Sequence, residues 1–323
     1  MSEIAFAGNR YAAIAGESVL DCLLRNGLAL PHSCKSGVCQ SCLMRAVSGT
    51  IPAKAQQGLR DTLRAQGYVL SCSFVPEGDV EVSVNDSAAL SVSGTIEAVD
   101  FYSASVARVQ VRTEAPFEYR PGQYANLIRD DGLVRSYSIA SVPEHEETLE
   151  FHVARVTDGK MSGWLHDGGA LGARIQVQGP VGNCFYVGGA PEQPLFLAGT
   201  GTGLAPLYGI VRDALRCGHQ GDIHLFHGSV RAEGLYLVEE LRALAASHAN
   251  LHYHPCVLQG EAEGIATEPI DAYSLRVTPS LKAHKVYLCG HPDLVRQMQR
   301  KTFLAGASLA NIYADAFIPS PSS

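Results

Sequence analysis

The spacing of hydrophobic and polar residues changes twice along the 323-residue chain. In the first part, short alternating stretches surround one helical stretch. The helix is predicted over residues 18–26, with Ser18 as its N-cap and Gly27 just beyond its end. Strands are predicted at 4–6 and 11–14, joined by a Gly8-Asn9 turn, and at 43–47, 68–71 and 80–84. Strands wrapped on one helix indicate a compact α+β domain over residues 1–88.

Between residues 93 and 188 the period is mostly two. Alternating stretches occur at 105–112, 123–128, 135–140, 149–155 and 174–178, separated by turn pairs such as Pro121-Gly122 and Gly168-Gly169. Many short strands with little helix favour a closed antiparallel β-barrel. The small, polar stretch 85–93 that precedes them is predicted to be a linker.

From residue 192 to residue 323 the pattern changes again. Apolar strands at 195–198, 223–227, 251–256 and 286–289 alternate with helical stretches at 204–217, 237–246 and 292–304. Strands that alternate with helices of this length indicate an α/β domain with a doubly wound parallel sheet.

Composition and charge narrow the class of protein. With 46% hydrophobic and 18% charged residues the chain is globular, and no apolar run reaches the roughly 18 residues that a membrane span requires. A net charge of −7 without basic clusters argues against a nucleic-acid surface. The first residues lack a signal peptide and the nine cysteines are an odd number, so we expect a cytoplasmic protein without disulfides.

Four of the cysteines carry the most specific signal. Cys34, Cys39 and Cys42 are spaced C-x4-C-x2-C, and Cys72 follows later, which matches the ligand set of a plant-type [2Fe-2S] cluster. Zinc is the alternative, but it usually takes two C-x2-C pairs, and only one is present here. We expect Cys22, Cys184, Cys217 and Cys256 to be small core residues.

A glycine run marks the last domain. Gly199, Thr200, Gly201, Thr202 and Gly203 directly follow a predicted strand and precede a helix that contains Pro206. Alternate glycines let a pyrophosphate approach backbone N–H groups and the positive end of the helix. The G-x-G-x-x-G fingerprint is not matched, so a purely structural turn stays open as an alternative.

The coenzyme is not decided by the sequence. The acid that would bind a ribose 2′-hydroxyl is missing after the second strand of this domain, where Ser229 and Arg231 stand instead. Arg231 could pair with a 2′-phosphate, so both NADH and NADPH stay open.

Five motifs in order resemble the ferredoxin–NAD(P)+ reductase superfamily. They are the cysteine set, Arg135-Ser136-Tyr137-Ser138, the glycine run, Cys289-Gly290-His291-Pro292 and the terminal IYADAF at 312–317. Within it, the chain is similar to reductase components of bacterial Rieske aromatic-ring dioxygenases of the naphthalene dioxygenase type. This resemblance implies a β-grasp ferredoxin domain at 1–88, an FAD-binding β-barrel at 93–188 and an NAD(P)-binding domain at 192–323.

The resemblance also implies residue roles. Arg135 is expected on the FAD pyrophosphate, where a planar cationic fork suits two phosphate oxygens, with Ser136 beside it. Tyr137 is expected against the isoalloxazine ring and Ser138 near its N5 atom. Cys289 is expected beside the nicotinamide, with Gly290 and Pro292 nearby, and Phe317 is expected over one flavin face.

Two further segments are assigned in the same way. Gly159, Lys160, Met161 and Ser162 open a short predicted helix that is expected to meet the same pyrophosphate. His152 and Val153, on the preceding strand, are expected near the ribityl or adenosine part of the flavin.

Together these features imply an NAD(P)H oxidoreductase that passes hydride electrons from NADH to FAD and then singly through the cluster. We expect a monomer that docks transiently on a terminal oxygenase or an intermediary ferredoxin. Rival acceptors are a diiron monooxygenase and a CDP-sugar deoxygenation system. An alternative of another class is an iron–sulfur redox sensor or a plain electron carrier.

Overall fold

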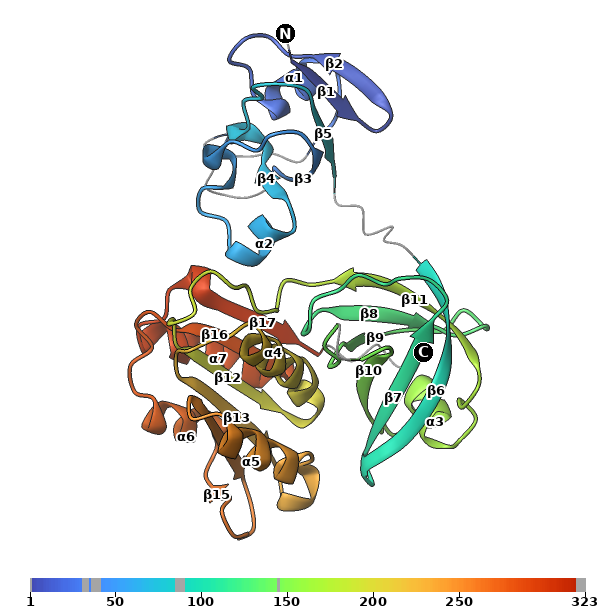
Figure 1. The fold of residues 1–323 in the computed structure, drawn as a ribbon, viewed down its shortest axis with the longest axis vertical. Helices are drawn as coiled ribbons and strands as arrows, with labels where there is room; N and C mark the ends of the chain where they lie inside the picture. The colour runs from blue at the N-terminus through green and yellow to red at the C-terminus, as the bar shows by residue number, and fades with distance from the viewer. Residues whose placement is uncertain (1, 31–34, 36–41, 85–90, 144–145, 318–323) are drawn as a thin grey trace. The chain divides into compact units, whose positions relative to one another are not determined.

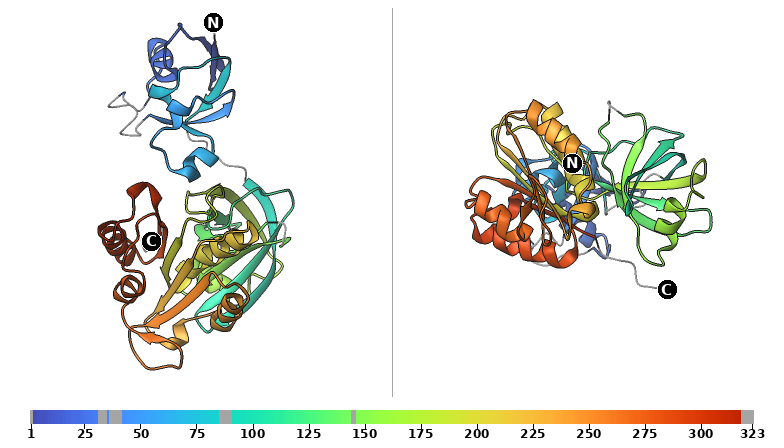
Figure 2. Two further views of the ribbon diagram at one scale, coloured as in Figure 1. Left: turned by 60° about the vertical axis from the view of Figure 1, so that its left-hand side comes forward. Right: turned by 90° about the horizontal axis from the view of Figure 1, so that it is seen from below.

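The computed structural model describes residues 2–30, 35, 42–84, 91–143 and 146–317. It divides into two compact units, Met1–Ala88 and Ala89–Ser323 (Figure 1). Figure 2 shows the elements of each unit from two further directions. None of the helices in the described ranges has the length and hydropathy that a membrane crossing requires.

The first unit is a mixed five-stranded sheet with one main helix. The sheet order is β2-β1-β5-β3-β4, and the central pair β1 and β5 is parallel. The elements are β1 (Glu3–Phe6), β2 (Asn9–Ala12), α1 (Val19–Arg25), β3 (Leu43–Ser48), η1 (Ala53–Gln56), α2 (Asp61–Ala65), β4 (Tyr68–Leu70), η2 (Ser71–Ser73) and β5 (Val80–Ser83). Leu23 of α1 packs with Ile4 and Val82 of the sheet in one apolar core, which confirms the predicted α+β domain.

Local chemistry explains the helix and corrects one turn. Ser18 Oγ accepts a hydrogen bond from the backbone N–H of Asp21 at 3.1 Å, so Ser18 caps α1 as predicted. The hairpin turn lies one residue earlier than the predicted Gly8-Asn9. Ala7 and Gly8 both have positive φ, at 49° and 79°, while Asn9 already pairs with Phe6.

The second unit begins with a six-stranded antiparallel sheet in the order β10-β7-β6-β11-β8-β9. An isolated bridge between Ile139 and Phe151 joins the two ends of this order and closes the predicted barrel. Its elements are β6 (Ser91–Ser103), β7 (Val106–Thr113), β8 (Tyr124–Ile128), β9 (Val134–Ser138), β10 (Leu149–Ala154), α3 (Lys160–His166) and β11 (Arg174–Val181).

The predicted linker over 85–93 is wrong at its end. Residues 85–90 lie outside the described ranges, but Ser91, Val92 and Ser93 belong to β6 and pair with β11. Val92 packs against the barrel core, whereas the two serines are polar positions of an alternating strand. A small polar composition therefore hid the start of a strand.

The rest of the second unit is an all-parallel sheet in the order β15-β14-β13-β12-β16-β17 (Figure 1). Leu241 of α5 and Leu207 of α4 belong to the core on one face, and Val295 of α7 and Ile270 of α6 belong to the core on the other. The elements are β12 (Leu195–Thr200), η3 (Gly201–Gly203), α4 (Leu204–Arg216), β13 (Ile223–Ser229), η4 (Ala232–Gly234), α5 (Val238–Ser247), β14 (Leu251–Val257), β15 (Ala266–Thr267), α6 (Ile270–Val277), β16 (Lys285–Gly290), α7 (Pro292–Leu304), η5 (Leu309–Asn311) and β17 (Ile312–Ala316). Helices on both faces confirm the doubly wound fold. The boundary between barrel and sheet near residues 188–192 stays a prediction.

Candidate functional site

The first unit brings two of the four predicted cluster ligands together. Antiparallel pairing of Leu43 with Leu70 carries the chain so that Cys42 and Cys72 meet, with their Sγ atoms 3.3 Å apart. Ser71 fixes this arrangement, because its hydroxyl donates to the Cys42 carbonyl at 2.8 Å. Both cysteines are free thiols. Two converging thiols fit a shared iron–sulfur cluster. Cys34 and Cys39 lie outside the described residues.

The predicted flavin motif forms strand β9 at the barrel wall. Along it, Arg135 and Tyr137 are half-buried, Ser136 is exposed and Ser138 is buried. The guanidinium of Arg135 donates to the Val134 carbonyl at 2.7 Å, and no carboxylate in the described part of the chain pairs with it. A cation without an acidic partner suits a phosphate. Burial raises the pKa of Tyr137, so its phenol stays neutral.

The four residues at the start of α3 differ in their surroundings. The helix begins at Lys160, as predicted, and Lys160 is exposed. A Cβ on Gly159 would lie 2.4 Å from Ser162 Oγ, so the glycine is needed for this close approach. Ser162 Oγ donates to the Gly159 carbonyl and accepts from the Val156 N–H at 3.1 Å. Met161 is buried in the barrel core, which leaves Lys160 as the accessible side chain.

The side chains of His152 and Val153 both lie inside the protein. Val153 is buried in the barrel core, and His152 places Nδ1 2.9 Å from the Tyr236 hydroxyl and Nε2 2.9 Å from Glu150 Oε1. Both ring nitrogens are therefore engaged within the protein. The flavin contacts expected of His152 and Val153 stay a prediction.

The partner of His152 is a buried carboxylate. Burial alone would raise the pKa of Glu150, but hydrogen bonds from His152 and Arg108 outweigh it and hold that pKa at about 2. Burial lowers the pKa of His152, so we assign a neutral ring that donates through Nε2 and accepts from Tyr236. Because Tyr236 belongs to the nucleotide part, this network ties the barrel to the parallel sheet.

The glycine run follows β12 at the carboxyl edge of the parallel sheet, as predicted, and its glycines divide into two kinds. A Cβ on Gly203 would lie 2.5 Å from the Cys289 carbonyl, and one on Gly199 2.8 Å from a Leu207 methyl, so both permit close packing. Gly201 has φ of +55° and open space around it. Thr202 beside it is half-exposed, while Pro206 is buried in α4. Thr200, Gly201 and Thr202, all only partly buried, are thus the part of the run that a ligand could reach.

A cation, Arg231, follows the end of β13, and Glu233 stands two residues further on in η4. Strand β13 ends at Ser229, and the exposed Arg231 donates to Gln259 Oε1 at 3.4 Å. Within the described ranges no carboxylate pairs with Arg231. At the neighbouring strand end, Pro292 occupies the first turn of α7 and His291 caps that helix.

The most specific convergence joins three distant segments. Cys289, at the end of β16, pairs with Asp315 of β17, and Ser138 Oγ of the barrel donates to Asp315 Oδ2 at 3.1 Å. Burial raises the pKa of the Asp315 carboxyl. Phe317 follows two residues later, half-buried, with its N–H donating to the Gly290 carbonyl at 2.9 Å.

Asp315 is the site residue that the sequence reasoning missed. Its signal was available, because it is an acid within the otherwise apolar strand 312–317 and stands two residues before the predicted Phe317. Cys289 itself is buried, and its Sγ lies 3.8 Å from Sγ of Cys184.

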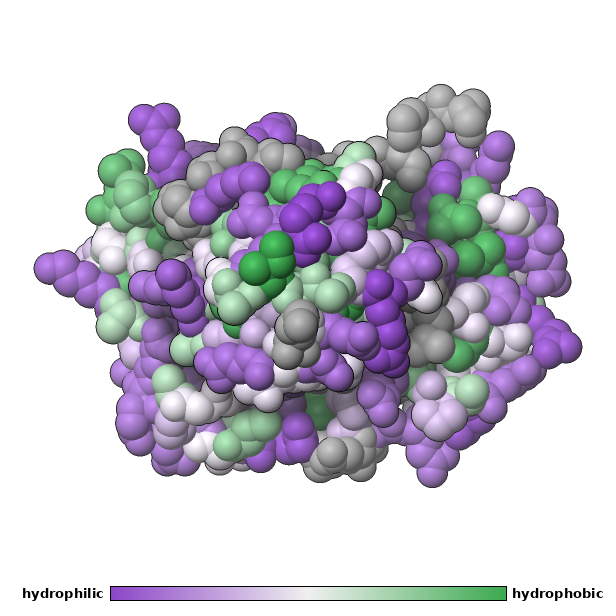
Figure 3. Space-filling view, turned by 90° about the horizontal axis from the view of Figure 1, so that it is seen from above, coloured by the Kyte–Doolittle hydropathy of each residue, from purple (hydrophilic) through white to green (hydrophobic). Residues whose placement is uncertain are grey.

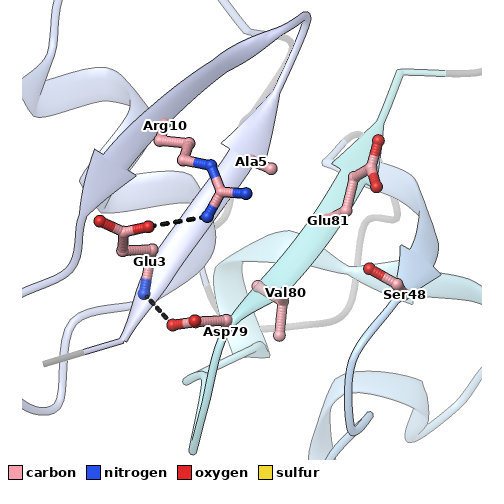
Figure 4. A pocket seen from close by; sticks show the side chains of 7 residues that line it. All are labelled: Glu3, Ala5, Arg10, Ser48, Asp79, Val80 and Glu81. Atoms are coloured by element: carbon pink, nitrogen blue, oxygen red, sulfur yellow. Dashed lines mark hydrogen bonds and ion pairs between the residues drawn. The ribbon is translucent and has the colours of Figure 1, made fainter.

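The first unit has one surface pocket whose described lining residues include no cysteine. It has a volume of about 110 Å³ and is lined by Glu3, Ala5, Arg10, Ser48, Asp79, Val80 and Glu81 (Figure 4). Glu3 pairs with Arg10 at 2.9 Å, and its N–H donates to Asp79 at 2.9 Å. The pocket is smaller than the roughly 300 Å³ that small-molecule sites usually need, and Arg10 and Asp79 are already bound to Glu3. Polar residues also predominate on the face drawn in Figure 3.

The chain combines a unit with converging cysteines, a closed barrel and a doubly wound sheet. This combination is typical of iron–sulfur flavoprotein reductases. Three family descriptions match in this order: a 2Fe-2S iron-sulfur cluster binding domain at residues 7–77, an oxidoreductase FAD-binding domain at 93–186 and an oxidoreductase NAD-binding domain at 197–300. The chain is therefore an oxidoreductase with a [2Fe-2S] cluster, FAD and NAD(P) as cofactors.

Full-length relatives narrow this class to a family. The chain is 34% identical to the reductase component, ferredoxin–NAD(P)+, of a naphthalene 1,2-dioxygenase system of Pseudomonas putida, over 94% of each chain. It is 31% identical to the reductase subunit of an aromatic O-demethylase of Amycolatopsis, over 98% of each chain. The crystal structure of an Amycolatopsis cytochrome P450 reductase superposes with a TM-score of 0.68 at 29% identity, over 99% of each chain. The chain belongs to the family of ferredoxin–NAD(P)+ reductase components, as its motifs predicted.

Proposed function

We propose that the chain takes electrons from NADH and delivers them to the terminal oxygenase, or to an intermediary ferredoxin, of an aromatic-ring dioxygenase system. The observation that carries this proposal is the convergence of Ser138, Cys289 and Asp315, which brings the barrel motif to the carboxyl edge of the parallel sheet. Ligands of doubly wound sheets bind at that edge. The 34% identity to the naphthalene dioxygenase reductase supports the acceptor class.

Different groups of residues would bind the cluster and the flavin. FAD supplies the exchange between the two electrons of a hydride and the single electrons that a [2Fe-2S] cluster accepts. Cys42 and Cys72 hold the cluster together with Cys34 and Cys39. Arg135 and Lys160 neutralise the FAD pyrophosphate, because each presents a cation without a carboxylate partner in the described ranges.

At the centre of the site, protein groups orient the reacting rings. Ser138, whose hydroxyl donates to Asp315 at 3.1 Å, would hydrogen-bond near the flavin N5 atom. Because burial raises the pKa of Asp315, this carboxyl can retain a proton at higher pH than an exposed one. Tyr137 and Phe317 would pack against the flavin faces, and Cys289 would position the nicotinamide.

The coenzyme is NADH in this proposal. Arg231 is the one side chain at the end of β13 that favours a 2′-phosphate, and its side chain is already hydrogen-bonded to Gln259. Exchanging Arg231 for alanine should leave the ratio of kcat/KM for NADH over NADPH almost unchanged. A large rise in that ratio would show that Arg231 normally recruits NADPH.

A second acceptor is favoured by one observation. The structural similarity to a cytochrome P450 reductase, with a TM-score of 0.68, makes a P450-type O-demethylase the alternative acceptor.

In either case the chain acts as a monomer that docks transiently, since delivering electrons one at a time requires repeated dissociation. A reducing cytoplasm suits its free buried thiols, Cys22, Cys184, Cys256 and Cys289.

Reconstitution tests the acceptor. The cluster- and FAD-loaded chain is mixed with NADH and either the ferredoxin and oxygenase of a naphthalene-type dioxygenase or a P450 O-demethylase, and product is measured. We expect turnover with the dioxygenase components. Turnover only with the P450 would replace the first acceptor by the second. Reduction of cytochrome c without turnover in either system would remove both acceptors while leaving the reductase activity intact.

A further inference from the structure

Histidines gather at the amino-terminal end of strands β13 and β14. His224 of β13 lies directly opposite His252 of β14 in the parallel register, and their rings stack with centroids 4.7 Å apart. Asp222 precedes β13, and its Oδ1 lies 3.4 Å from His252 Nε2. One donor atom from each of these three residues lies within 4.8 Å of the other two. The backbone register therefore converges two imidazoles and a carboxylate.

A third imidazole, that of His254, is hydrogen-bonded to this group. His254, two residues after His252 and so on the same face of β14, places Nε2 3.0 Å from Nδ1 of His224. A hydrogen bond to one ring nitrogen fixes the tautomer and leaves the other nitrogen free to bind. His254 thus occupies the position of an outer partner that orients a metal-ligating histidine.

Aromatic packing holds these rings in place. The ring of His254 stacks on Phe226 at 4.6 Å and meets the edge of Tyr273 from α6 at 6.1 Å. Burial lowers the pKa of His254 to about 4 and also lowers the pKa of His224. Neutral imidazoles keep the lone pairs that a metal ion needs.

The outer donors can adjust. The side chains of His252 and Asp222 are 40% and 67% exposed, so small rotations can close the three donors onto bonds of about 2.0–2.2 Å. Three protein ligands leave one position of a tetrahedral ion open to water. Two imidazoles with one carboxylate suit Zn²⁺ and other divalent transition metals better than Mg²⁺ or Ca²⁺.

This group lies away from the cofactor edge. His224 is the second residue of β13, whereas Ser229 ends the strand at the nucleotide-binding edge, five residues and roughly 16 Å further along. The two ends of a parallel strand open onto opposite edges of the sheet. The histidines are therefore separate from the residues assigned to NADH and FAD.

We propose that Asp222, His224 and His252 form a binding site for a divalent transition metal ion, Zn²⁺ being the best match, with His254 positioning His224. The ion joins β13 to β14 at the amino-terminal edge of the nucleotide sheet. Because it would bind the folded state and link two strands, it stabilises this sheet.

Equilibrium dialysis against buffered Zn²⁺ tests the site on the cluster- and FAD-loaded chain. Elemental mass spectrometry is expected to find about one zinc per chain, and the thermal midpoint of the second unit should rise. The His224→Ala/His252→Ala double variant should lose both effects. Asp222→Asn, which keeps the side-chain volume, should weaken binding about tenfold or more.

The matched control is His291→Asn. It removes an exposed imidazole that lies 3.9 Å from a carboxylate of Asp293, yet keeps an acceptor able to cap α7. This variant should bind zinc like the parent chain. FAD content and cluster absorbance verify that each variant is folded. Equal zinc in the parent chain and the double variant, or loss of zinc in His291→Asn alone, would overturn the proposal.

Discussion

The two units each bring a pair of cysteine sulfurs together, at similar distances and in different surroundings. Sγ of Cys42 lies 3.3 Å from Sγ of Cys72 in the first unit, and Sγ of Cys184 lies 3.8 Å from Sγ of Cys289 in the second. Burial raises the pKa of both Cys42 and Cys289. Neither the sulfur distance nor the direction of the pKa shifts of Cys42 and Cys289 therefore distinguishes the two pairs.

The donors around each pair make the difference. In the first unit the C-x4-C-x2-C motif adds two further cysteines, which completes a four-sulfur ligand set. In the second unit the described contacts of Cys184 and Cys289 include no further sulfur, and the neighbours of Cys289 are Asp315 and the glycine run. We therefore assign the first pair to the proposed metal centre and the second to packing at the carboxyl edge of the parallel sheet. A substitution in one unit should therefore remove the cofactor of that unit and leave the cofactor of the other unit in place.

The largest effect is expected from Cys72→Ser. Loss of one ligand should remove the cluster and lower NADH-dependent cytochrome c reduction about 100-fold or more. FAD content and NADH-dependent ferricyanide reduction should persist, because the second unit is intact. Iron analysis and both assays measure this. Cys184→Ala, the matched control, should keep its iron, and loss of iron in that variant would erase the contrast between the two pairs.

A smaller effect is expected from Arg135→Ala, which should affect FAD and leave the cluster in place. Removing the unpaired guanidinium should weaken FAD binding by about 10- to 100-fold, while the iron content stays unchanged. Arg135→Lys should recover only part of the affinity, because an ammonium lacks the bidentate fork. Fluorescence titration of released FAD measures both variants. Unchanged affinity in Arg135→Ala would remove Arg135 from the flavin site.

The sequence predicted the parts of the molecule whose signals are local. Ser18 caps its helix, the alternation of 149–155 forms a barrel strand, and the glycine run turns at the end of an apolar strand, because each depends on neighbouring residues. The linker prediction failed at Ser91–Ser93, where pairing with β11 imposes a strand on a polar stretch. Tertiary pairing of that kind leaves no mark in the local composition.

The candidate site shows the same limit. Cysteine spacing located a metal centre directly, whereas the bond between Ser138 and Asp315 joins residues 177 positions apart. The resemblance assigned His152 to the flavin, and only the fold shows its contacts with Tyr236 and Glu150. Motifs indicate which residues act, and the fold decides which of them meet.

The smallest effect on turnover is expected from Asp315→Asn. The amide still accepts the hydrogen bond from Ser138, so NADH-dependent flavin reduction should fall only about tenfold. Adding Ser138→Ala should cost little more, because both residues act through one hydrogen bond. Stopped-flow absorbance of the flavin measures the rates. Full additivity of the two substitutions would show that they act independently.

The same variant has a signature in pH. Burial raises the folded pKa of Asp315, so the folded chain keeps a proton that the unfolded chain releases, and stability falls as pH rises between those two pKa values. Asparagine has no such proton. The unfolding midpoint of Asp315→Asn relative to the parent chain should therefore increase with pH across that range and stay constant below it.

Anaerobic titration with NADH tests directly whether the two units form one electron-transfer chain. Flavin and cluster absorbance are followed together as reductant is added to the fully loaded protein. We predict that both chromophores are reduced, with cluster bleaching dependent on FAD and absent in Arg135→Ala stripped of flavin. A flavin that bleaches completely while the cluster stays oxidised would contradict electron transfer between the units.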